Sequence, residues 1–238
     1  MVRSGTLYLI PSTLGPGDAA QILSASALAV LTRLTTFVAE NPRTARVFLK
    51  AAGYPRRLQE VEFRVLNEHT RAEELSALLQ PLLEGRDCGL LSEAGCPAIA
   101  DPGAALVRLA HWHAVRVVPL VGPSSILLAL MASGLDGQRF SFHGYLPVES
   151  TARRKALLEL ERASKRERRT QTFIEAPYRN VQLVQAVLEA CQGNTLLCLA
   201  TDLTLETESV QMQAVSAWKA GAVPPIARRP TVFLLYSE

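Results

Sequence analysis

The sequence has no long apolar run, no paired cysteine motif and no strong excess of charge of one sign. Its 238 residues carry a net charge of +3, which is too small to indicate a nucleic-acid-binding protein by itself. No apolar stretch approaches the length of a membrane span, and the first apolar run, residues 6–10, is too short for a signal peptide. These absences predict a cytoplasmic protein that does not enter a membrane.

The four cysteines form no C-x-x-C pair and have no spacing typical of a zinc site. Cys88, Cys191 and Cys198 lie in or beside apolar runs, where small core residues are expected. Cysteines used in this way are typical of a reducing compartment. The histidines also lack a third ligand nearby, so the sequence predicts no metal site.

Apolar strand patterns and amphipathic helix patterns alternate along the chain. In the first half, apolar runs at residues 7–10, 88–91 and 115–118 predict a mostly parallel sheet. The second half repeats the alternation, and a mixed sheet is expected there. A turn at Asp136-Gly137 separates a domain of residues 1–137 from a domain of residues 138–238. The prediction is two α/β domains with a ligand cleft between them.

Capping residues locate the start of two helices. Asn41 followed by Pro42 is typical of an N-cap and the first helical position. Thr70 and Glu73 have the spacing of a capping box before an apolar stripe. Helices are therefore expected to begin directly after Asn41 and Thr70.

Two loops rich in glycine and proline follow predicted strands and give the strongest functional signal. Residues 92–103 contain glycines and prolines too densely for regular structure, and residues 121–125 lead from the next strand into a helix. In open α/β sheets, ligands bind beyond the carboxyl ends of the strands, so both loops are expected to line one crevice. An ordinary loop, and an N-cap at Ser124, would explain each segment taken alone.

These loops resemble motifs of the tetrapyrrole (corrin/porphyrin) methylase superfamily, whose members use S-adenosylmethionine. The family's Ser-Asp-Ala-Gly-Thr-Pro loop running to Asp-Pro-Gly is matched by Ser92–Pro97 and Asp101–Gly103. Further motifs match in the same order at residues 121–125, 144–147, 173–179 and 200–204. Within the superfamily the chain is most similar to the ribosomal RNA small subunit methyltransferase I branch, in a short form without the C-terminal extension of longer members.

The resemblance implies an S-adenosylmethionine-dependent methyltransferase, active as a homodimer, that methylates a ribose oxygen of an RNA such as 16S rRNA. It also implies that the following residues line the cofactor: Leu14, Gly95, Cys96, Ile99, Ser124, Ser125, Glu175, Ala176 and Leu203. Methylation of a tetrapyrrole or another small molecule stays open as an alternative. Cofactor binding without catalysis also stays open, because Asn41 and Glu93 both stand where the family has Asp.

A ribose hydroxyl must lose its proton during methyl transfer, so a carboxylate is expected near the acceptor. The candidates at strand ends or in the first loop are Glu40, Glu93, Asp101, Glu175 and Asp202. Two of them precede an arginine, and these pairs, Glu40 with Arg43 and Glu175 with Arg179, are predicted to be catalytic. Each pair could instead be an intrahelical ion pair contributing about 0.2–0.5 kcal/mol. Asp101 could instead cap the next helix.

Two basic runs, Arg153–Lys155 and Lys165–Arg169, occur early in the second half. They could bind the phosphates of an RNA. They could also form a solvated helix face, and arginines would suit a carboxylate-rich tetrapyrrole as well. The basic runs therefore do not decide the substrate.

Overall fold

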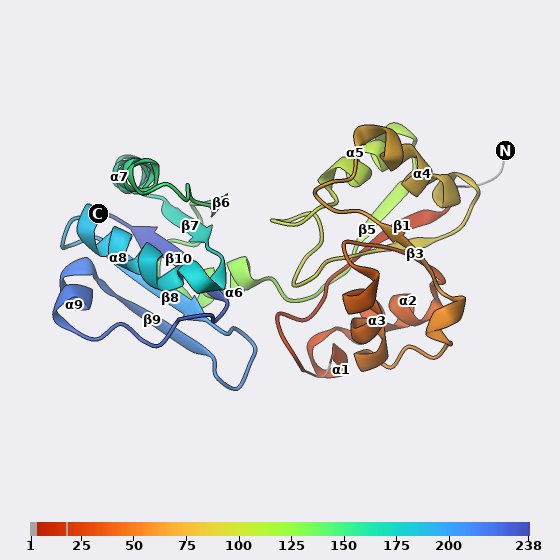
Figure 1. The fold of residues 1–238 in the computed structure, drawn as a ribbon, viewed down its shortest axis with the longest axis horizontal. Helices are drawn as coiled ribbons and strands as arrows, with labels where there is room; N and C mark the ends of the chain where they lie inside the picture. Colours follow the sequence, from red (N-terminus) through yellow and green to blue (C-terminus); the bar gives the residue numbers. More distant parts are fainter. Residues whose placement is uncertain (1–3, 18) are drawn as a thin grey trace. The chain divides into compact units, whose positions relative to one another are not determined.

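The computed structural model describes residues 4–17 and 19–238 and divides the chain into two compact units, residues 1–124 and 125–238. Each unit contains one five-stranded sheet covered by helices (Figure 1). The boundary after Ser124 precedes the turn at Asp136 because helix α6 (Ser125–Ser133) packs on strands of the second unit. The two α/β units agree with the predicted fold class.

The sheet of the first unit has five parallel strands in the order β3-β2-β4-β1-β5. These are β1 (Thr6–Ile10), β2 (Thr36–Ala39), β3 (Glu62–Val65), β4 (Cys88–Leu91) and β5 (Arg116–Pro119). Strands β2 and β4 are buried along their whole length, as apolar strands between two helix layers should be. The predicted parallel sheet is therefore confirmed.

Helices lie on both faces of this sheet (Figure 1). They are α1 (Ala19–Ile22), α2 (Ala25–Arg33), α3 (Pro42–Ala51), the 3-10 helix η1 (Leu58–Glu60), α4 (Ala72–Leu83) and α5 (Ala104–Trp112). Helices α2 and α3 share one core cluster with Phe37, whereas α4 and α5 share another with Leu90. The connections that leave the neighbouring strands β1 and β4 therefore run to opposite faces. This arrangement makes the β1–β4 pair the topological switch point, where open α/β sheets bind ligands.

The helix starts differ slightly from prediction. Helix α3 begins at Pro42 with Asn41 as its N-cap, as predicted. The capping contact of α4 lies one residue later than predicted, because the backbone N–H of Arg71 donates to Glu74 Oε2 at 2.7 Å. Thr70 is already engaged in the preceding turn, where its hydroxyl accepts a backbone N–H. It is therefore not the cap of α4.

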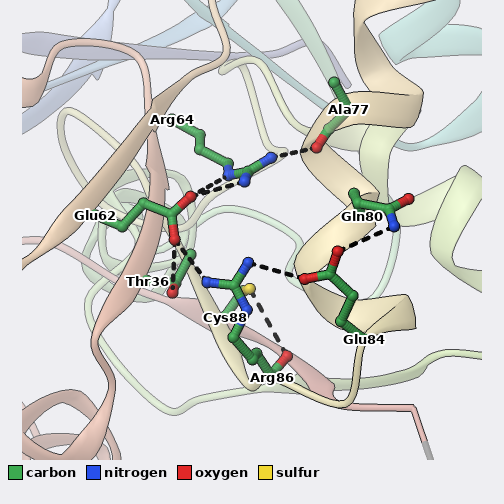
Figure 2. A network of polar contacts seen from close by, with 8 residues as sticks. All are labelled: Thr36, Glu62, Arg64, Ala77, Gln80, Glu84, Arg86 and Cys88. Carbon is green, nitrogen blue, oxygen red and sulfur yellow. Dashed lines mark hydrogen bonds and ion pairs between the residues drawn. The ribbon is translucent and has the colours of Figure 1, made fainter.

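A network of charged side chains lies at the amino ends of β2, β3 and β4 (Figure 2). Glu62 forms ion pairs with Arg64 and Arg86, each at 2.7 Å. Arg86 also pairs with Glu84 at the end of α4, at 3.1 Å. We call these four residues the amino-end network; within it each charge faces an opposite charge.

The second unit holds the predicted mixed sheet, in the order β6-β7-β10-β8-β9. Strands β6 (Phe140–Tyr145) and β7 (Thr170–Ile174) are parallel. Strand β10 (Thr231–Tyr236) is antiparallel to both β7 and β8 (Leu196–Thr201), and β9 (Ser209–Ala214) is antiparallel to β8. Because β10 runs opposite to both of its neighbours, β7 and β8 end at the same edge of the sheet.

Helices α6, α7 (Ser150–Glu167), α8 (Asn180–Ala190) and α9 (Val215–Ala220), with the 3-10 helix η2 (Pro177–Arg179), complete the second unit. The rings of Phe173 and Phe233 stack with centroids 5.7 Å apart in its core. Throughout the described residues, no helix combines the length and apolar character needed to cross a membrane.

Three cysteines are buried, as predicted for small core residues. Burial raises the pKa of Cys88, Cys191 and Cys198 to about 12, so these thiols stay neutral at physiological pH.

Candidate functional site

The loops that follow β1, β4 and β5 are bonded to one another. The backbone N–H of Ser12 donates to the carbonyl of Gly95 at 2.8 Å, and the N–H of Gly95 donates back to Ser12 at 3.2 Å. The hydroxyls of Ser12 and Ser92 donate to the carbonyls of Ser92 and Gly95, at 2.7 and 2.6 Å. Cys96 Sγ lies 3.4 Å from the carbonyl of Pro123 and so joins the third loop. The two glycine-rich loops thus meet at the switch point.

Gly95 permits the close approach of these loops. Its φ of +72° is left-handed, and a Cβ there would lie 3.2 Å from Leu14 Cδ2 and 3.6 Å from the Pro123 carbonyl. A Cβ on Gly122, in the loop after β5, would lie 2.4 Å from the Cβ of Pro11. The loops therefore approach one another closely at two positions that have no side chain.

An apolar pocket of about 510 Å³ lies at the carboxyl ends of β1 and β5. Its lining comes from the loop after β4, helix α5 and the ends of the two strands, and includes Cys96 and Ile99, two of the residues predicted to line the cofactor. Ala98 and Ala100 in the same loop have φ values of 66° and 57°, which non-glycine residues adopt at a cost. Strain of this kind is typical of functional loops.

A second, more polar pocket of about 450 Å³ lies between the loop after β1, helix α3 and the loop after β4. Ser12, Thr44 and Glu93 contribute its polar groups. Gly15 and Gly17 line it as well, so the turn after β1 closes one side of this pocket. Two pockets therefore adjoin the Ser12–Gly95 bridge, one apolar and one polar.

Three carboxylates, Glu40, Glu93 and Asp101, gather at the carboxyl ends of β2 and β4; we call them the carboxylate cluster. Burial, then the charge of Glu40 and a hydrogen bond with it, raise the pKa of Asp101 to about 7, and the charge of Glu93 adds to this. Thr44 Oγ1 donates to Glu93 Oε1 at 2.6 Å. None of the three forms an ion pair with a cation among the residues that the structure describes. The cluster therefore contains a carboxyl group that exchanges its proton near neutral pH.

The structure separates the first predicted pair. Glu40 lies near enough to Asp101 to raise the pKa of that carboxyl, and within the described residues no ion pair joins Glu40 to exposed Arg43. The physical reason is that Glu40 precedes Asn41, the N-cap of α3, so it does not lie on a helix face with Arg43. Asp101 does not cap α5 either, because Gly103 is the N-cap.

The second predicted pair is formed, at the carboxyl end of β7. Arg179 Nη2 lies 2.6 Å from Glu175 Oε1, and the side chain of Glu175 is 0% exposed. The backbone N–H of Ala176 donates to the same oxygen at 2.7 Å. Glu175 Oε2 and Arg179 Nε are buried and have no partner within the described part of the chain. Glu175 Oε1 is therefore held by two donors, whereas Glu175 Oε2 and Arg179 Nε have no partner among the described residues.

Three further residues predicted to line the cofactor lie at the ends of a strand and a helix. Leu203 follows β8 and is buried, while Ser124 and Ser125 are half-buried where α6 begins. Asp202 accepts from Arg229 Nε at 2.8 Å and from Thr207 Oγ1 at 2.7 Å, so its carboxylate is already engaged.

Sequence reasoning missed the roles of Ser12 and Arg229. Ser12 forms the backbone bridge to Gly95, and Arg229 holds Asp202. A serine in a loop and an arginine before a proline carry no distinctive pattern. Over residues 4–17 and 19–238 the structure also contains no group of His, Cys, Asp or Glu side chains arranged to hold a metal ion.

The fold and the two pockets are typical of α/β proteins that bind small ligands at the carboxyl ends of their strands. Residues 6–215 match the family described as Tetrapyrrole (Corrin/Porphyrin) Methylases. The chain belongs to this family, as the motifs predicted.

Two relatives carry the same name, Ribosomal RNA small subunit methyltransferase I. The protein from Vibrio cholerae is 35% identical over 206 residues, covering 86% of this chain and 67% of the relative. The protein from Xylella fastidiosa is 36% identical over 211 residues, covering 88% of this chain and 72% of the relative. The predicted branch of the family is therefore confirmed.

Solved structures of the family share the fold at low identity. The methyltransferase CobJ has a TM-score of 0.64 and 19% identity, covering 98% of this chain and 94% of that chain. A uroporphyrin-III C-methyltransferase from Thermus thermophilus, complexed with S-adenosylhomocysteine, has a TM-score of 0.58 and 18% identity, covering 98% of each chain. At this level of identity the likeness shows the fold and not the substrate.

Proposed function

We propose that this chain is an S-adenosylmethionine-dependent methyltransferase that methylates a ribose 2′-oxygen of small-subunit ribosomal RNA. The observation that carries the proposal is the similarity, at 35–36% identity over 86–88% of the chain, to proteins named for this RNA. Nothing in the site favours a tetrapyrrole over RNA, and the neighbours that act on tetrapyrroles are only 16–19% identical.

The first unit fits the proposed cofactor. The apolar pocket of about 510 Å³ falls within the range of small-molecule sites, about 300–1,000 Å³. Gly95 leaves its backbone bare beside this pocket, and Cys96 and Ile99 line it. When bound, the cofactor supplies a methyl group that its sulfonium already activates for displacement.

The residues proposed to hold the cofactor in the first unit are Leu14, Gly95, Cys96, Ile99 and Ser124. The assignment of Ser125, Glu175, Ala176 and Leu203, which belong to the second unit, rests on the family motifs. The loops after β1, β4 and β5 support the first set, because hydrogen bonds join them.

The chain's own catalytic task is to take the proton of the acceptor hydroxyl. We assign this task to Glu40, with Asp101 as the neighbouring carboxyl group. The two carboxyl groups share a half-buried position, so below about pH 7 the pair retains a proton. Above that pH both groups are ionised and the pair can accept a proton from the acceptor.

Two arginines are proposed to position the acceptor. Arg43 is exposed in the first turn of α3, next to Thr44 of the polar pocket, where it can bind a phosphate. Arg179 is fixed by the buried Glu175, which keeps its guanidinium in one orientation. Glu175 and Arg179 thus form the second proposed catalytic pair.

Transfer of a labelled methyl group tests the proposal and its alternatives. The purified protein is incubated with labelled S-adenosylmethionine and with separate RNA, protein and small-molecule fractions of a strain that lacks it. We expect label in the RNA fraction. Label in the small-molecule fraction would support the tetrapyrrole alternative, and cofactor binding without label in any fraction would support a protein without catalysis.

Two finer statements accompany the proposal. We propose a homodimer, because Leu127 and Met131, one turn apart on α6, are 51% and 80% exposed and a second copy could cover them. We also propose that the protein acts in the cytoplasm, where ribosomal RNA is its acceptor. A monomer mass by light scattering at micromolar concentration would contradict the homodimer.

A further inference from the structure

Two tyrosines are exposed at neighbouring strand ends of the second unit. Tyr145 is the last residue of β6 and is 59% exposed, while Tyr178 lies in η2, directly after β7, and is 68% exposed. Tyr145 pairs in register with Ile174, the last residue of the parallel strand β7. Both tyrosines therefore belong to the edge of the sheet where the buried Glu175 lies.

A break in the strand sets the orientation of Tyr145. The pairing of β6 with β7 shifts between Phe142 and Tyr145, and Gly144 has a left-handed φ of +64°. Irregularities of this kind re-aim the side chain that follows them and are common next to binding sites. A large ring exposed by such a device points to a partner outside the unit.

A fixed cation accompanies the two rings. The guanidinium carbon of Arg179 lies 5.2 Å from the ring centroid of Tyr178, and its Nη1 donates to the Tyr178 hydroxyl at 3.2 Å. The hydrogen bond with Glu175 is the main reason that the pKa of Arg179 is raised, and Tyr178 and Tyr145 are both near enough to add to it. Arg179 is therefore a permanent positive charge beside the ring of Tyr178.

Further cations follow Tyr145 in the chain. The loop after it leads into α7, and Arg153 Nη1 donates back to the carbonyl of Val148 in this loop at 3.1 Å. Arg154 and Lys155 are exposed, and in the described part of the chain neither forms an ion pair. Glu149, just before the helix, accepts two backbone N–H groups as the cap of α7, and Glu159, one turn after Lys155, forms no ion pair among the described residues. The start of α7 therefore presents unpaired positive charge.

We propose that Tyr145 and Tyr178 stack an unpaired nucleobase of single-stranded RNA, while Arg154 and Lys155 bind its neighbouring phosphates. Exposed aromatic faces accept any base, and arginine and lysine neutralise phosphate, which together are the chemistry of single-strand binding. Bases inside an RNA duplex are already stacked and cannot use the tyrosines. The inference rests on the proposed function and names the part of the RNA that this surface recognises.

Fluorescence anisotropy with a labelled single-stranded RNA of twelve nucleotides tests the tyrosines. Tyr145→Ala and Tyr178→Ala should each weaken binding about fivefold or more, the effect of losing one stacked base. Tyr145→Phe and Tyr178→Phe keep the ring and should bind like the wild type. Trp112→Ala, which removes a 75% exposed ring from the first unit, is the matched control and should change nothing. Melting temperatures of all variants verify that each one folds.

The dependence of binding on salt tests the cations. In the Arg154→Gln/Lys155→Gln variant, the slope of log K against log salt should fall by about 0.7 for each phosphate that the variant no longer neutralises. The control Arg56→Gln/Arg57→Gln removes two adjacent exposed cations of the first unit and should leave the slope unchanged.

The outcomes separate this inference from the proposed function. If the wild type binds and methylates RNA and the alanine variants bind equally well, the tyrosine surface is overturned while the function stands. If the wild type neither binds nor methylates RNA, both fail. If the wild type binds uroporphyrin instead, and the alanine variants lose that binding, the two tyrosines stack a planar macrocycle and the RNA assignment is overturned.

Discussion

Charged side chains lie at both ends of the strands of the first unit. Among the described residues, those of the amino-end network are paired with opposite charges, whereas those of the carboxylate cluster are not. In the amino-end network, Glu62 faces Arg64 and Arg86 at 2.7 Å, and Glu84 faces Arg86 at 3.1 Å (Figure 2). At the carboxyl ends, the carboxylate cluster gathers acids of one sign and forms no ion pair with any described cation. The charges of the amino-end network are therefore paired, whereas the acids of the carboxylate cluster have no cationic partner among the described residues.

The pKa values of Glu62 and Asp101 are shifted in opposite directions, because Glu62 lies beside arginines and Asp101 lies beside other acids. Burial opposes ionisation of Glu62, but hydrogen bonds from Arg64 and Arg86 outweigh it and lower its pKa. Burial of Asp101 acts together with the charge of Glu40, so its pKa rises to about 7. Perturbed acids without a cation are typical of functional sites, whereas paired acids support the fold. The comparison therefore assigns stability to the amino ends and chemistry to the carboxyl ends.

The largest effect is expected when a side chain is added at Gly95, where the loops meet at the switch point. Gly95→Val places a side chain against Leu14 and the Pro123 carbonyl at a left-handed φ. S-adenosylmethionine at millimolar concentration should raise the melting temperature of the wild type by mass action, and the variant should lose this shift. The measurement is thermal unfolding with and without cofactor.

Gly134→Val is the matched control for backbone strain. Gly134 has the same φ of +72°, but a Cβ there meets nothing within 4 Å. This variant should lose some stability and keep the full cofactor shift. Equal shifts for both variants would mean that the cofactor does not approach Gly95.

A smaller but still large effect is expected at the carboxylate cluster. Glu40→Gln should slow methyl transfer about a hundredfold, because a general base contributes typically 10²–10⁴-fold. Cofactor affinity should barely change, since Glu40 does not line the apolar pocket. Single-turnover rate and affinity are measured on the same protein, and normal turnover would move the search for a base to Glu175 and Asp202.

Ionisation of the carboxylate cluster should also lower the free energy of unfolding above neutral pH. The folded pKa of Asp101, about 7, exceeds its usual 3.8, so its contribution to the free energy of unfolding is present below pH 4 and lost as pH rises through 7. Asp101→Asn should therefore be more stable than the wild type at pH 8, by on the order of 1 kcal/mol after allowing for solvent screening. Urea unfolding at pH 8 and pH 4 measures the difference, which should vanish at pH 4. A variant less stable at pH 8 would contradict the raised pKa.

The smallest effect is expected at the amino-end network. Glu62→Gln should lower the free energy of unfolding by about 0.2–1 kcal/mol, the range for exposed ion pairs, and leave methyl transfer unchanged. Because the pKa of Glu62 is lowered on folding, this loss should appear above its ordinary value of 4.5 and disappear as pH falls through the folded pKa. A large loss of turnover in this variant would contradict a purely stabilising role of the amino-end network.

Local patterns were enough to predict much of the fold and the meeting of the loops. The loop after β4 follows a strand whose apolar run is continuous, and Gly95 with its neighbouring prolines predicted an irregular loop. The Asn41-Pro42 cap was also correct, because it depends on adjacent residues only.

Contacts distant in sequence could not be predicted in the same way. Glu40 and Asp101 come close enough to interact because strands β2 and β4 are neighbours in the sheet. The alternative of an intrahelical ion pair between Glu40 and Arg43 does not hold among the described residues, because helical spacing does not apply before the N-cap. The catalytic role of the two residues stays a prediction. The exposure of Tyr145 depends on a strand irregularity that composition does not reveal.

The pH dependence of methyl transfer to small-subunit ribosomal RNA tests the central claim most directly. Single-turnover rates are measured from pH 5 to pH 9 for the wild type and Asp101→Asn, with cofactor and RNA saturating. We predict a wild-type rate that falls as pH drops through about 7, because the carboxylate pair regains its proton, and a variant that loses this step. A wild-type rate that is the same on both sides of pH 7, or a variant that keeps the same step, would contradict it.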